Sequence, residues 1–497
     1  MSAAAVDGGV QQPRSRGSQL FGRGLLYVVI WSLQMVASVV VSPVLAHTLG
    51  PAEFGSLASA IAIYQLLVVL AVCGLDQALQ VERAAAPDNR SARGLLAAGI
   101  LLAFLVAGAA AATATWWAGW LGFPESGRLV WIALLWTAPG GSVLVVLSLL
   151  QSEDRLGRFA VVSIVSSVGG QVLGLGGMLV FDRSAEVYAA GGVVSQVAAL
   201  LIGVVLTRPR PAGLVDAPLL RRGFKLGLPL MLTGLSIFVL NVSDRLVTQK
   251  ILGSTEVGRF QVAYTLGYVL VLILSFTNRA WIPRLAEIVE THERWQVVRE
   301  SRDGILRLLM PAILGITLAA PVLLRFVAPP SFRPESLLVV VFLVAAAGFP
   351  VAAVGASGRM LITLRRGRPL AWSASEAVAV KLAMNLLLVP WLGIAGAAAA
   401  TLVALTAQAV IQNRSLPRDL APERPSWRLV AACALVAALA AATTVLPQDD
   451  LWNWSRFGVG LACLPWFWVA LTRLRRGTPA PATGPRSTTE VLPVSTH

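Results

Sequence analysis

The sequence places one lysine in the middle of a mostly apolar stretch, where it could bind a phosphate group. Lys381 lies in the middle of residues 371–389, and Asn385 follows one helical turn later, so both side chains are expected on one helix face. A lysine at the centre of a bilayer costs roughly 2.5–3.5 kcal/mol unless it meets a cavity or a partner. The ammonium could instead be structural, either paired with Glu376 or Asp244 or extended toward the membrane surface.

An adjacent acid and base lie in the second half of another apolar stretch, residues 226–248. Asp244 and Arg245 are neighbours, and Asn241 shares the face of Asp244 at a spacing of three residues. Arginine binds phosphate through two parallel hydrogen bonds, whereas an aspartate inside a membrane can carry a proton or a cation. The pair could thus act as a gate, a phosphate contact or an ion site, or it could hold two helices together.

Three polar residues recur every four positions in the first apolar stretch. Gln34, Ser38 and Ser42 predict a polar stripe along one helix. Such a stripe suits the hydroxyl groups of a sugar, and it equally suits packing against another helix through hydrogen bonds. Arg23 lies at the start of this stretch, where it could meet an incoming diphosphate, although the topology alone explains an arginine there.

Two tyrosines and an arginine mark the apolar stretch at residues 260–278. Tyr264 and Tyr268 lie one turn apart and could stack on sugar rings, although aromatic stripes more often pack inside a protein. Arg279 follows the last residue of the stretch, on the side predicted to be cytoplasmic. These residues complete the set of candidate ligand contacts.

The composition indicates that most of this chain lies in lipid. Hydrophobic residues make up 56% of the 497 residues, charged residues 13%, and the mean hydropathy is +0.73. A soluble domain carries about 25% charged residues. The three cysteines lie within apolar stretches, which indicates packing instead of disulfides or metal binding. The sequence contains no GxxxxGK(S/T) phosphate loop, so we expect no internal ATPase, and we expect no bound cofactor or metal.

Fourteen apolar stretches are long enough to cross a bilayer, which takes roughly 20 residues. Most of the 40 Lys and Arg residues fall in alternate connections between them. By the positive-inside rule these connections and both termini are cytoplasmic. Only three of the basic residues are lysines, and together with the abundant Ala and Gly this is typical of a GC-rich bacterial genome, so we expect the chain in the cytoplasmic membrane of a bacterium. Topology and anionic lipid headgroups thus explain the basic charge, and no nucleic-acid partner is expected. The stretches lie near residues 25–46, 56–76, 94–117, 129–150, 159–181, 187–206, 226–248, 260–278, 305–327, 336–358, 371–389, 393–412, 428–446 and 455–472.

A short repeat relates the two halves of the chain. The motif LGxxExG occurs as LGPAEFG at residues 49–55 and as LGSTEVG at residues 252–258, each time between two predicted spans. Six spans separate the copies, and because six is even, the two halves share one orientation in the membrane. Transporters built from such parallel repeats hold their substrate between the two halves. The repeat therefore predicts two six-helix lobes with a site between them.

Beyond the repeat, three stretches resemble a known family: HTLGPAEFGSLASAIAIYQLLVVLAVCGLDQAL, LPLMLTGLSIFVLNVSDRLVTQKILGSTEVGRFQVAYTL and NLLLVPWLGIAGAAAATLVA. They are similar to polysaccharide flippases of the multidrug/oligosaccharidyl-lipid/polysaccharide (MOP) exporter superfamily. The resemblance covers roughly residues 20–415, and the segment 241–264 is its most specific part. It implies an all-α polytopic membrane protein with a MOP/MATE-like fold. The last two spans resemble the extra helix pair of fourteen-helix members, which include the lipid II flippases.

The resemblance also implies a secondary transporter and not an enzyme. Its cargo would be an undecaprenyl-diphosphate-linked oligosaccharide, moved from the inner to the outer leaflet by alternating access. A proton or sodium gradient or the membrane potential would supply the energy, and polysaccharide polymerases or glycosyltransferases would be its protein partners. Lipid II or a cationic drug as cargo, and a membrane enzyme of glycan assembly, are the alternatives.

Five segments are expected along the chain. The longest connection, about 279–304, has an apolar side and predicts an amphipathic cytoplasmic helix, and the end of the chain is rich in Pro, Thr and Ser, which predicts disorder. The segments are a cytoplasmic tail at 1–22, an N-lobe at 23–210, a C-lobe at 211–415, an extra helix pair at 416–474 and a disordered cytoplasmic tail at 475–497.

Overall fold

Helices make up the regular structure of the described chain. The computed structural model describes the backbone of residues 16–85, 89–123, 127–288, 290–417 and 425–476. Within these ranges, side-chain burial and contacts are described from residue 37 onward, except at 272–273, 275–287, 291 and 474–476. These residues contain no strand. Ten of their helical stretches are long and apolar enough to cross a membrane, and each of the fourteen predicted spans contains a helix. The predicted all-α polytopic fold class is confirmed.

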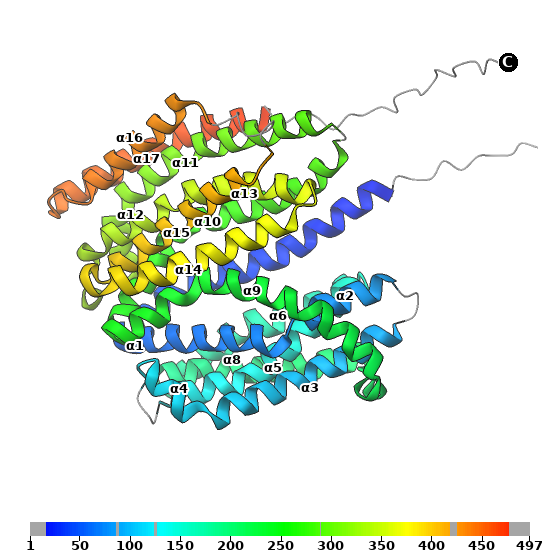
Figure 1. The fold of residues 1–497 in the computed structure, drawn as a ribbon. Helices are drawn as coiled ribbons and strands as arrows, with labels where there is room; N and C mark the ends of the chain where they lie inside the picture. The colour runs from blue at the N-terminus through cyan, green and yellow to red at the C-terminus, as the bar shows by residue number, and fades with distance from the viewer. Residues whose placement is uncertain (1–15, 86–88, 124–126, 289, 418–424, 477–497) are drawn as a thin grey trace, which may run out of the picture.

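The first half of the chain forms one lobe of the molecule (Figure 1). Its elements are α1 (Arg16–Val72), α2 (Leu75–Ala85), α3 (Arg90–Ala112), α4 (Ala114–Trp120), α5 (Arg128–Ser152), α6 (Leu156–Ile164), the π-helical turn η1 (Val165–Gly169), α7 (Gly170–Val180) and α8 (Ala185–Thr207). Helix α5 is central to this lobe, because it packs against α1, α3 and α8. Helix α1 continues through a kink at Gly50 and therefore holds two of the predicted spans.

The second half forms a second lobe, and one of its long helices lies between the two lobes (Figure 1). Its elements are the short turn η2 (Pro211–Val215), α9 (Ala217–Leu252), α10 (Ser254–Glu287), α11 (Thr291–Val327), η3 (Pro330–Phe332), η4 (Pro334–Leu337), α12 (Leu338–Ala346), α13 (Gly348–Thr363), α14 (Gly367–Leu392), α15 (Ile394–Arg414), α16 (Trp427–Thr443) and α17 (Asp450–Arg476). The intermediate helix is α9, which contacts α1 and α2 on one side and α10 and α14 on the other. The last two helices, α16 and α17, pack against α11.

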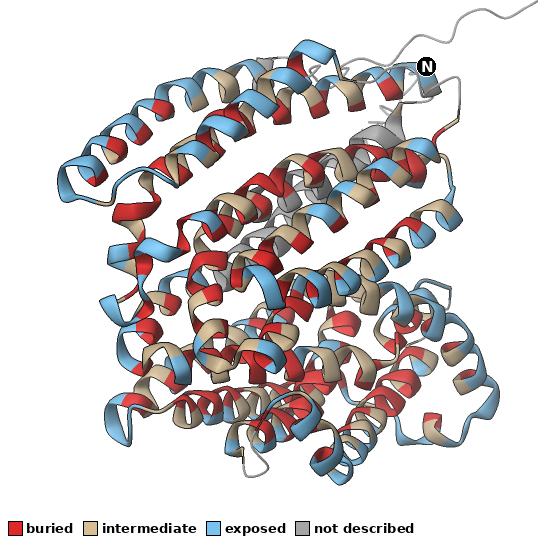
Figure 2. Ribbon diagram, turned by 60° about the vertical axis from the view of Figure 1, so that its left-hand side comes forward, coloured by how far each residue is buried: buried red, intermediate tan, exposed pale blue. Residues whose placement is uncertain are grey.

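The outward faces of the helices carry many large apolar side chains, and exposed positions recur along these faces (Figure 2). Trp116, Phe181 and Trp391 are 84%, 82% and 83% exposed. A soluble monomer rarely exposes extended apolar surface of this kind, whereas a bilayer accepts it without cost. The molecule is therefore a multi-pass membrane protein whose exposed apolar side chains face lipid.

The two copies of the LGxxExG motif have the same backbone conformation. Gly50 in the first copy has φ 71° and ψ 171°, and Gly253 in the second has φ 86° and ψ 175°. Glycine adopts positive φ readily, whereas a side chain would strain the backbone there. In both lobes this glycine turns the chain from one membrane span into the next. The motif thus marks a structural repeat as well as a repeat of sequence.

The last glycines of the two motif copies bring the lobes into backbone contact. A Cβ atom added to Gly55 would lie 1.7 Å from the Ser254 carbonyl oxygen, and one added to Gly258 would lie 2.0 Å from the Pro51 carbonyl oxygen. Helices α1 and α10 can cross this closely only because neither glycine has a side chain. The contact lies at the end of the bundle that the topology predicts to be extracytoplasmic.

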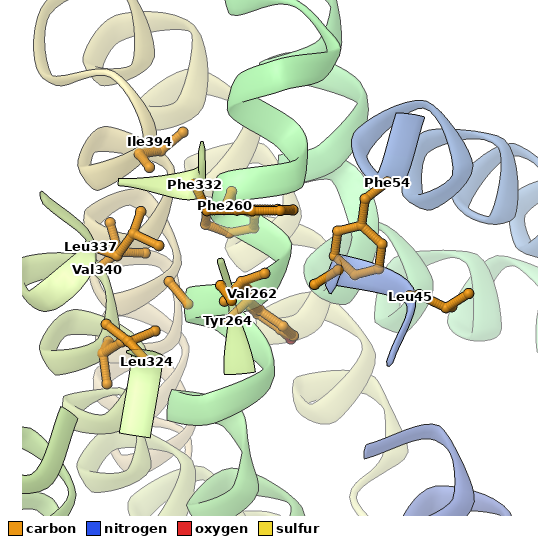
Figure 3. Packing of buried hydrophobic residues seen from close by; sticks show 14 of the residues in the cluster. Leu45, Phe54, Phe260, Val262, Tyr264, Leu324, Phe332, Leu337, Val340 and Ile394 are labelled. Carbon is orange, nitrogen blue, oxygen red and sulfur yellow. The ribbon is translucent and has the colours of Figure 1, made fainter. Parts of the chain in front are cut away.

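A shared apolar core surrounds this contact. Phe54, which precedes Gly55, packs edge-on against Phe332, with the ring centroids 6.1 Å apart. The same buried cluster includes Leu45 from the first lobe and Phe260 and Tyr264 from α10 (Figure 3). The lobes are therefore joined at this end by packed side chains as well as by backbone.

A second glycine contact joins α9 to the first lobe. It lies nearly the length of a membrane span away from the motif contact. A Cβ atom on Gly74 would lie 2.0 Å from the Gly227 carbonyl oxygen. Nearer the motif, the buried Ser59 hydroxyl donates to Oε1 of Gln249 at 3.0 Å. Helix α9 is thus attached to the first lobe close to both of its ends.

One prediction about a connection was wrong. The segment 279–304 does not form a helix of its own, because α10 continues to Glu287 and α11 already begins at Thr291. Trp295 and Val298 are buried in one cluster with Met360, so the apolar side of this segment joins the packed face of α11. The tails predicted at 1–22 and 475–497 lie outside the described residues, apart from the first residues of α1 and the last of α17.

Candidate functional site

The Asp244 carboxylate of α9 is the centre of a buried polar network. The Lys381 ammonium of α14 donates to Oδ2 at 2.8 Å, and Nδ2 of Asn385 donates to Oδ1 at 3.0 Å. The Thr401 hydroxyl of α15 adds a third hydrogen bond, to Oδ2 at 3.1 Å. Lys381 also donates to the Leu240 carbonyl oxygen. Three helices of the second half of the molecule therefore meet on one carboxylate.

This network decides between the structural alternatives for Lys381. Its partner is Asp244 and not Glu376, and the side chains of Lys381 and Asp244 are each only 1% exposed. Coulomb attraction is strong at such low dielectric, but so is the desolvation penalty, and an ion pair of this kind persists only when hydrogen bonds complete it. Here Asn385 and Thr401 complete it. In this conformation the ammonium is held inside the second lobe.

A cavity of about 260 Å³ lies between the lobes. One cation reaches it, Arg245, which is the only charged side chain among the described residues that line it. Its other polar contacts are hydroxyl and amide groups from both lobes, and its remaining lining is apolar. The lining residues are Ser38, Val41, Ser42, Leu45, Phe54, Leu57, Ala58, Ile61, Ala62 and Gln65 of α1, Gln171 of α7, Tyr188 of α8, Arg245 of α9 and Gln261 of α10.

The Arg245 guanidinium is fixed by its neighbours. Nε donates to Oε1 of Gln261 at 2.5 Å, and Nη1 donates to the Asn241 carbonyl oxygen at 3.4 Å. The guanidinium carbon also lies 5.0 Å from the centre of the Tyr264 ring, a cation–π distance. A guanidinium has five N–H donors, and described residues engage Nε and Nη1. Arg245 can therefore donate hydrogen bonds from its other N–H groups to an anion in the cavity while it keeps its bonds to Gln261 and Asn241.

The two predicted aromatic candidates support this arginine. Tyr264 and Tyr268 stack with ring centroids 4.8 Å apart and an angle of 18° between the rings. Tyr264 is buried in the core shared by the lobes, and the Tyr268 hydroxyl lies 3.5 Å from Oδ1 of Asn241. Asn241 in turn donates to the Ile237 carbonyl oxygen. In this conformation the tyrosines pack beneath Arg245 and do not line the cavity.

The predicted polar stripe on α1 does reach the cavity. Ser38 and Ser42 both line it, and Nε2 of Gln171 donates to the Ser38 hydroxyl at 2.8 Å. The side chains of three further candidates, Gln34, Arg23 and Arg279, lie outside the described residues. The structure thus brings Ser38, Ser42 and Arg245 together at one cavity, and it places Lys381, Asp244 and Asn385 together in the separate buried network.

Four polar residues of the cavity were not predicted from the sequence: Gln65, Gln171, Tyr188 and Gln261. None of them belongs to a polar stripe that the sequence analysis recognised, so no spacing pattern marked them. A glutamine inside a membrane span is nonetheless a signal, because its amide needs hydrogen-bond partners there.

The first motif copy closes the cavity toward one end. Leu45, Phe54 and Leu57 line the cavity, while Phe54 and its neighbour Gly55 belong to the crossing of α1 and α10. The cavity therefore lies directly beneath the contact that joins the lobes at the predicted extracytoplasmic end. Separation of the motif copies would open it toward that side.

Two helical lobes with a polar cavity between them are an arrangement shared with solved structures of lipid flippases and multidrug transporters. The lipid II flippase MurJ in an inward closed conformation superposes with a TM-score of 0.69 and 12% identity, over 90% of this chain and 99% of that one. An inward-facing multidrug resistance MATE family transporter of the MOP superfamily gives 0.58 and 15%, over 82% and 95%. A eukaryotic MATE transporter gives 0.51 and 15%, over 85% and 97%. At these identities the likeness shows the fold.

The sequence itself assigns the family. The family model described as polysaccharide biosynthesis protein matches residues 23–289, more than half of the chain, so the chain belongs to that family. No curated protein matches it. Membership in this family, together with the fold of MurJ and the MATE transporters, confirms the resemblance seen in the sequence.

Proposed function

We propose that the protein carries an undecaprenyl-diphosphate-linked oligosaccharide from the cytoplasmic to the outer leaflet by alternating access. The observation that supports this most is the cavity between the lobes, whose one described charged residue is the cation Arg245. Family membership agrees with a cargo used in polysaccharide synthesis. A secondary transporter of this kind needs no catalytic residue, because it only exposes one site to the two leaflets in turn.

The chemistry of the cavity suits such a cargo. A guanidinium binds phosphate oxygens through parallel hydrogen bonds, and the serine and glutamine side chains can exchange hydrogen bonds with sugar hydroxyls. The polyprenyl tail is apolar and can stay in the surrounding lipid while the head group enters. The cavity lining therefore contains hydrogen-bonding groups for both the diphosphate and the first sugar of the cargo.

The volume of the cavity indicates that the lobes must move during transport. About 260 Å³ is below the roughly 300–1,000 Å³ of ordinary small-molecule sites, and an oligosaccharide is larger than their ligands. The observed conformation is thus a closed one at the motif end. We propose that the crossing at Gly55 and Gly258 is the outer gate of the cycle.

The proposed energy source is a proton or sodium gradient or the membrane potential. Asp244 is the buried carboxylate through which a proton or a cation could act. The ammonium of Lys381 already neutralises it, so ion coupling at this site requires that the ion pair first separate. Transport driven by the membrane potential alone would not require that step.

A second cargo, lipid II, has one specific observation in its favour. The MurJ superposition covers 90% of this chain and thus extends beyond the two lobes, and the chain carries a terminal pair of helices, α16 and α17, next to α11. Lipid II offers the same diphosphate to Arg245, so the cavity does not distinguish the two cargoes. The distinction must come from transport itself.

Reconstitution of the purified protein in liposomes tests these proposals. We expect a fluorescent lipid-linked oligosaccharide to become accessible to an impermeant quencher faster in proteoliposomes than in empty liposomes, without ATP. Fluorescent lipid II and a cationic dye, assayed in parallel, identify the alternative cargoes. Faster movement of lipid II or of the dye than of the oligosaccharide lipid would contradict the proposal, as would glycosyl transfer catalysed by the purified protein.

The outer gate gives a separate prediction. Replacing Gly55 with valine should push α1 away from the Ser254 carbonyl and open the cavity outward. Overpacking typically costs about 1–3 kcal/mol, so the population of the closed state relative to the open state should fall about 5- to 150-fold. A single cysteine at Ser42, in a chain without the three native cysteines, should then react faster with an impermeant thiol reagent applied from outside. Gly108→Val is the matched control, because no atom lies within 4 Å of a Cβ atom there. Equal reaction rates in both variants would exclude the gate.

A further inference from the structure

A second pocket lies among the basic connections at the end of the bundle predicted to be cytoplasmic. Its volume is about 740 Å³, and four of the seven residues that line it are arginines. It is built by Asn89 and the first turn of α3 together with the connection after α8. The lining residues are Asn89, Arg90, Arg93, Arg208, Pro209, Arg210 and Pro211.

The two connections are fixed to each other through their backbones. The Arg210 amide donates to the Arg93 carbonyl oxygen at 3.1 Å. Arg208 ends α8 in a left-handed conformation, φ 50°, which turns the chain toward α3. The arginines therefore converge by construction, whereas the positive-inside rule requires only that they lie on the same side of the membrane.

One carboxylate beside the pocket is already neutralised. The Glu153 side chain is 3% exposed and accepts a hydrogen bond from Nδ2 of Asn89 at 2.6 Å. It also pairs with Arg155 at 2.9 Å and more loosely with Arg93 at 3.9 Å. Arg155 lies outside the pocket lining, so the Glu153 charge is balanced mainly by a residue from outside the pocket.

The start of α3 adds to this positive field. The helix begins at Arg90, and its first N–H groups have no partner within the helix. A helix N-terminus carries about half a positive charge and favours anions. Among the described residues, Nε of Arg93 is also buried without a hydrogen-bond partner. Arg208 and Arg210 are exposed and can close over a ligand.

We propose that this arginine pocket binds a pair of phosphate groups carried by a membrane lipid. Arginine forks match phosphate oxygens, and four of them suit a ligand with two phosphates better than one with a single phosphate. The pocket lies where lipid headgroups meet the protein in the predicted topology. Two lipids carry this chemistry, a cardiolipin with two phosphodiesters and a polyprenyl diphosphate. The inference does not depend on the cargo of the central cavity.

Lipid binding to the purified protein tests the proposal. We compare wild type with the double variant Arg208→Gln/Arg210→Gln, using cardiolipin, undecaprenyl diphosphate and phosphatidylglycerol as separate probes in native mass spectrometry. The variant should bind the first or the second probe about 30-fold more weakly, which corresponds to about 2 kcal/mol for two arginines. The probe that binds identifies the source of the phosphates. Phosphatidylglycerol, with one phosphate, should bind more weakly to wild type.

A matched control separates this pocket from general surface charge. Arg365→Gln/Arg366→Gln removes the same charge from exposed residues in another connection of the predicted cytoplasmic side. Arg365 also shares the left-handed conformation of Arg208, with φ 54° against 50°. This control should bind the probes nearly as wild type does. Equal weakening in both double variants, or none in either, would overturn the proposal, and matching unfolding temperatures exclude misfolding as the cause.

Discussion

Replacing Lys381 with alanine is expected to destabilise the protein by about 3–5 kcal/mol, the largest effect of any substitution considered for this chain. The loss arises because Asp244 would remain as a charge that is 1% exposed and has only Asn385 and Thr401 as hydrogen-bond donors. Thermal unfolding of the detergent-solubilised protein should show a markedly lower midpoint. Lys225→Ala is the matched control, since Lys225 is exposed on α9, and it should leave the midpoint unchanged.

A double substitution distinguishes the ion pair from the volume of its side chains. Lys381→Met with Asp244→Asn removes both charges and keeps approximate size, so it should recover most of the lost stability. Transport by this double variant then reports on the role of the pair. Full transport would assign the pair to structure, whereas a stable protein without transport would assign it to the conformational cycle. An unchanged midpoint in Lys381→Ala would contradict the buried network.

Replacing Arg245 with alanine should abolish most transport while leaving the fold intact. The guanidinium lines the cavity, and its loss removes hydrogen bonds to a charged ligand that contribute about 1.5–3 kcal/mol, or about 10- to 150-fold. The initial rate of lipid-linked oligosaccharide movement in proteoliposomes measures this. Arg245→Lys should recover part of the rate, since it keeps the charge and loses the fork.

The control for this substitution lies on the same helix. Lys250 is exposed near the end of α9 and does not line the cavity, so Lys250→Ala removes a positive charge without touching the proposed site. It should transport at the wild-type rate. If Lys250→Ala and Arg245→Ala slowed transport equally, the effect would be general electrostatics and the site would lie elsewhere.

The sequence was sufficient for the features that depend on local pattern. Apolar length marked every span, and the motif spacing marked the two lobes, because Gly50 and Gly253 require the same unusual backbone conformation. The helix break near Ile288 was missed, since the apolar side of the connection continues without a change of period into α11.

The site was harder to predict because its contacts join distant residues. Lys381 and Asp244 are 137 positions apart, so their pairing with each other was only one of several alternatives. The face of a helix that meets a cavity depends on how the lobes pack, which explains why Ser38 and Ser42 were identified and Gln171 and Gln261 were not. Hydrophobic patterning defines where helices are, and tertiary packing selects which polar groups share a space.

Helix α9 has a mechanical consequence that follows from its attachments. The first lobe holds this helix at Gly227 and again at Gln249, and the second lobe holds it between these points through Asp244. Hinged motion of one lobe against the other must therefore break one of these attachments or flex the helix between them. Pro229, which lacks an amide hydrogen, stands at the start of that interval and lowers the resistance to bending. While both attachments hold, the bending stiffness of α9 between Gly227 and Asp244 limits how far the two lobes can rotate against each other.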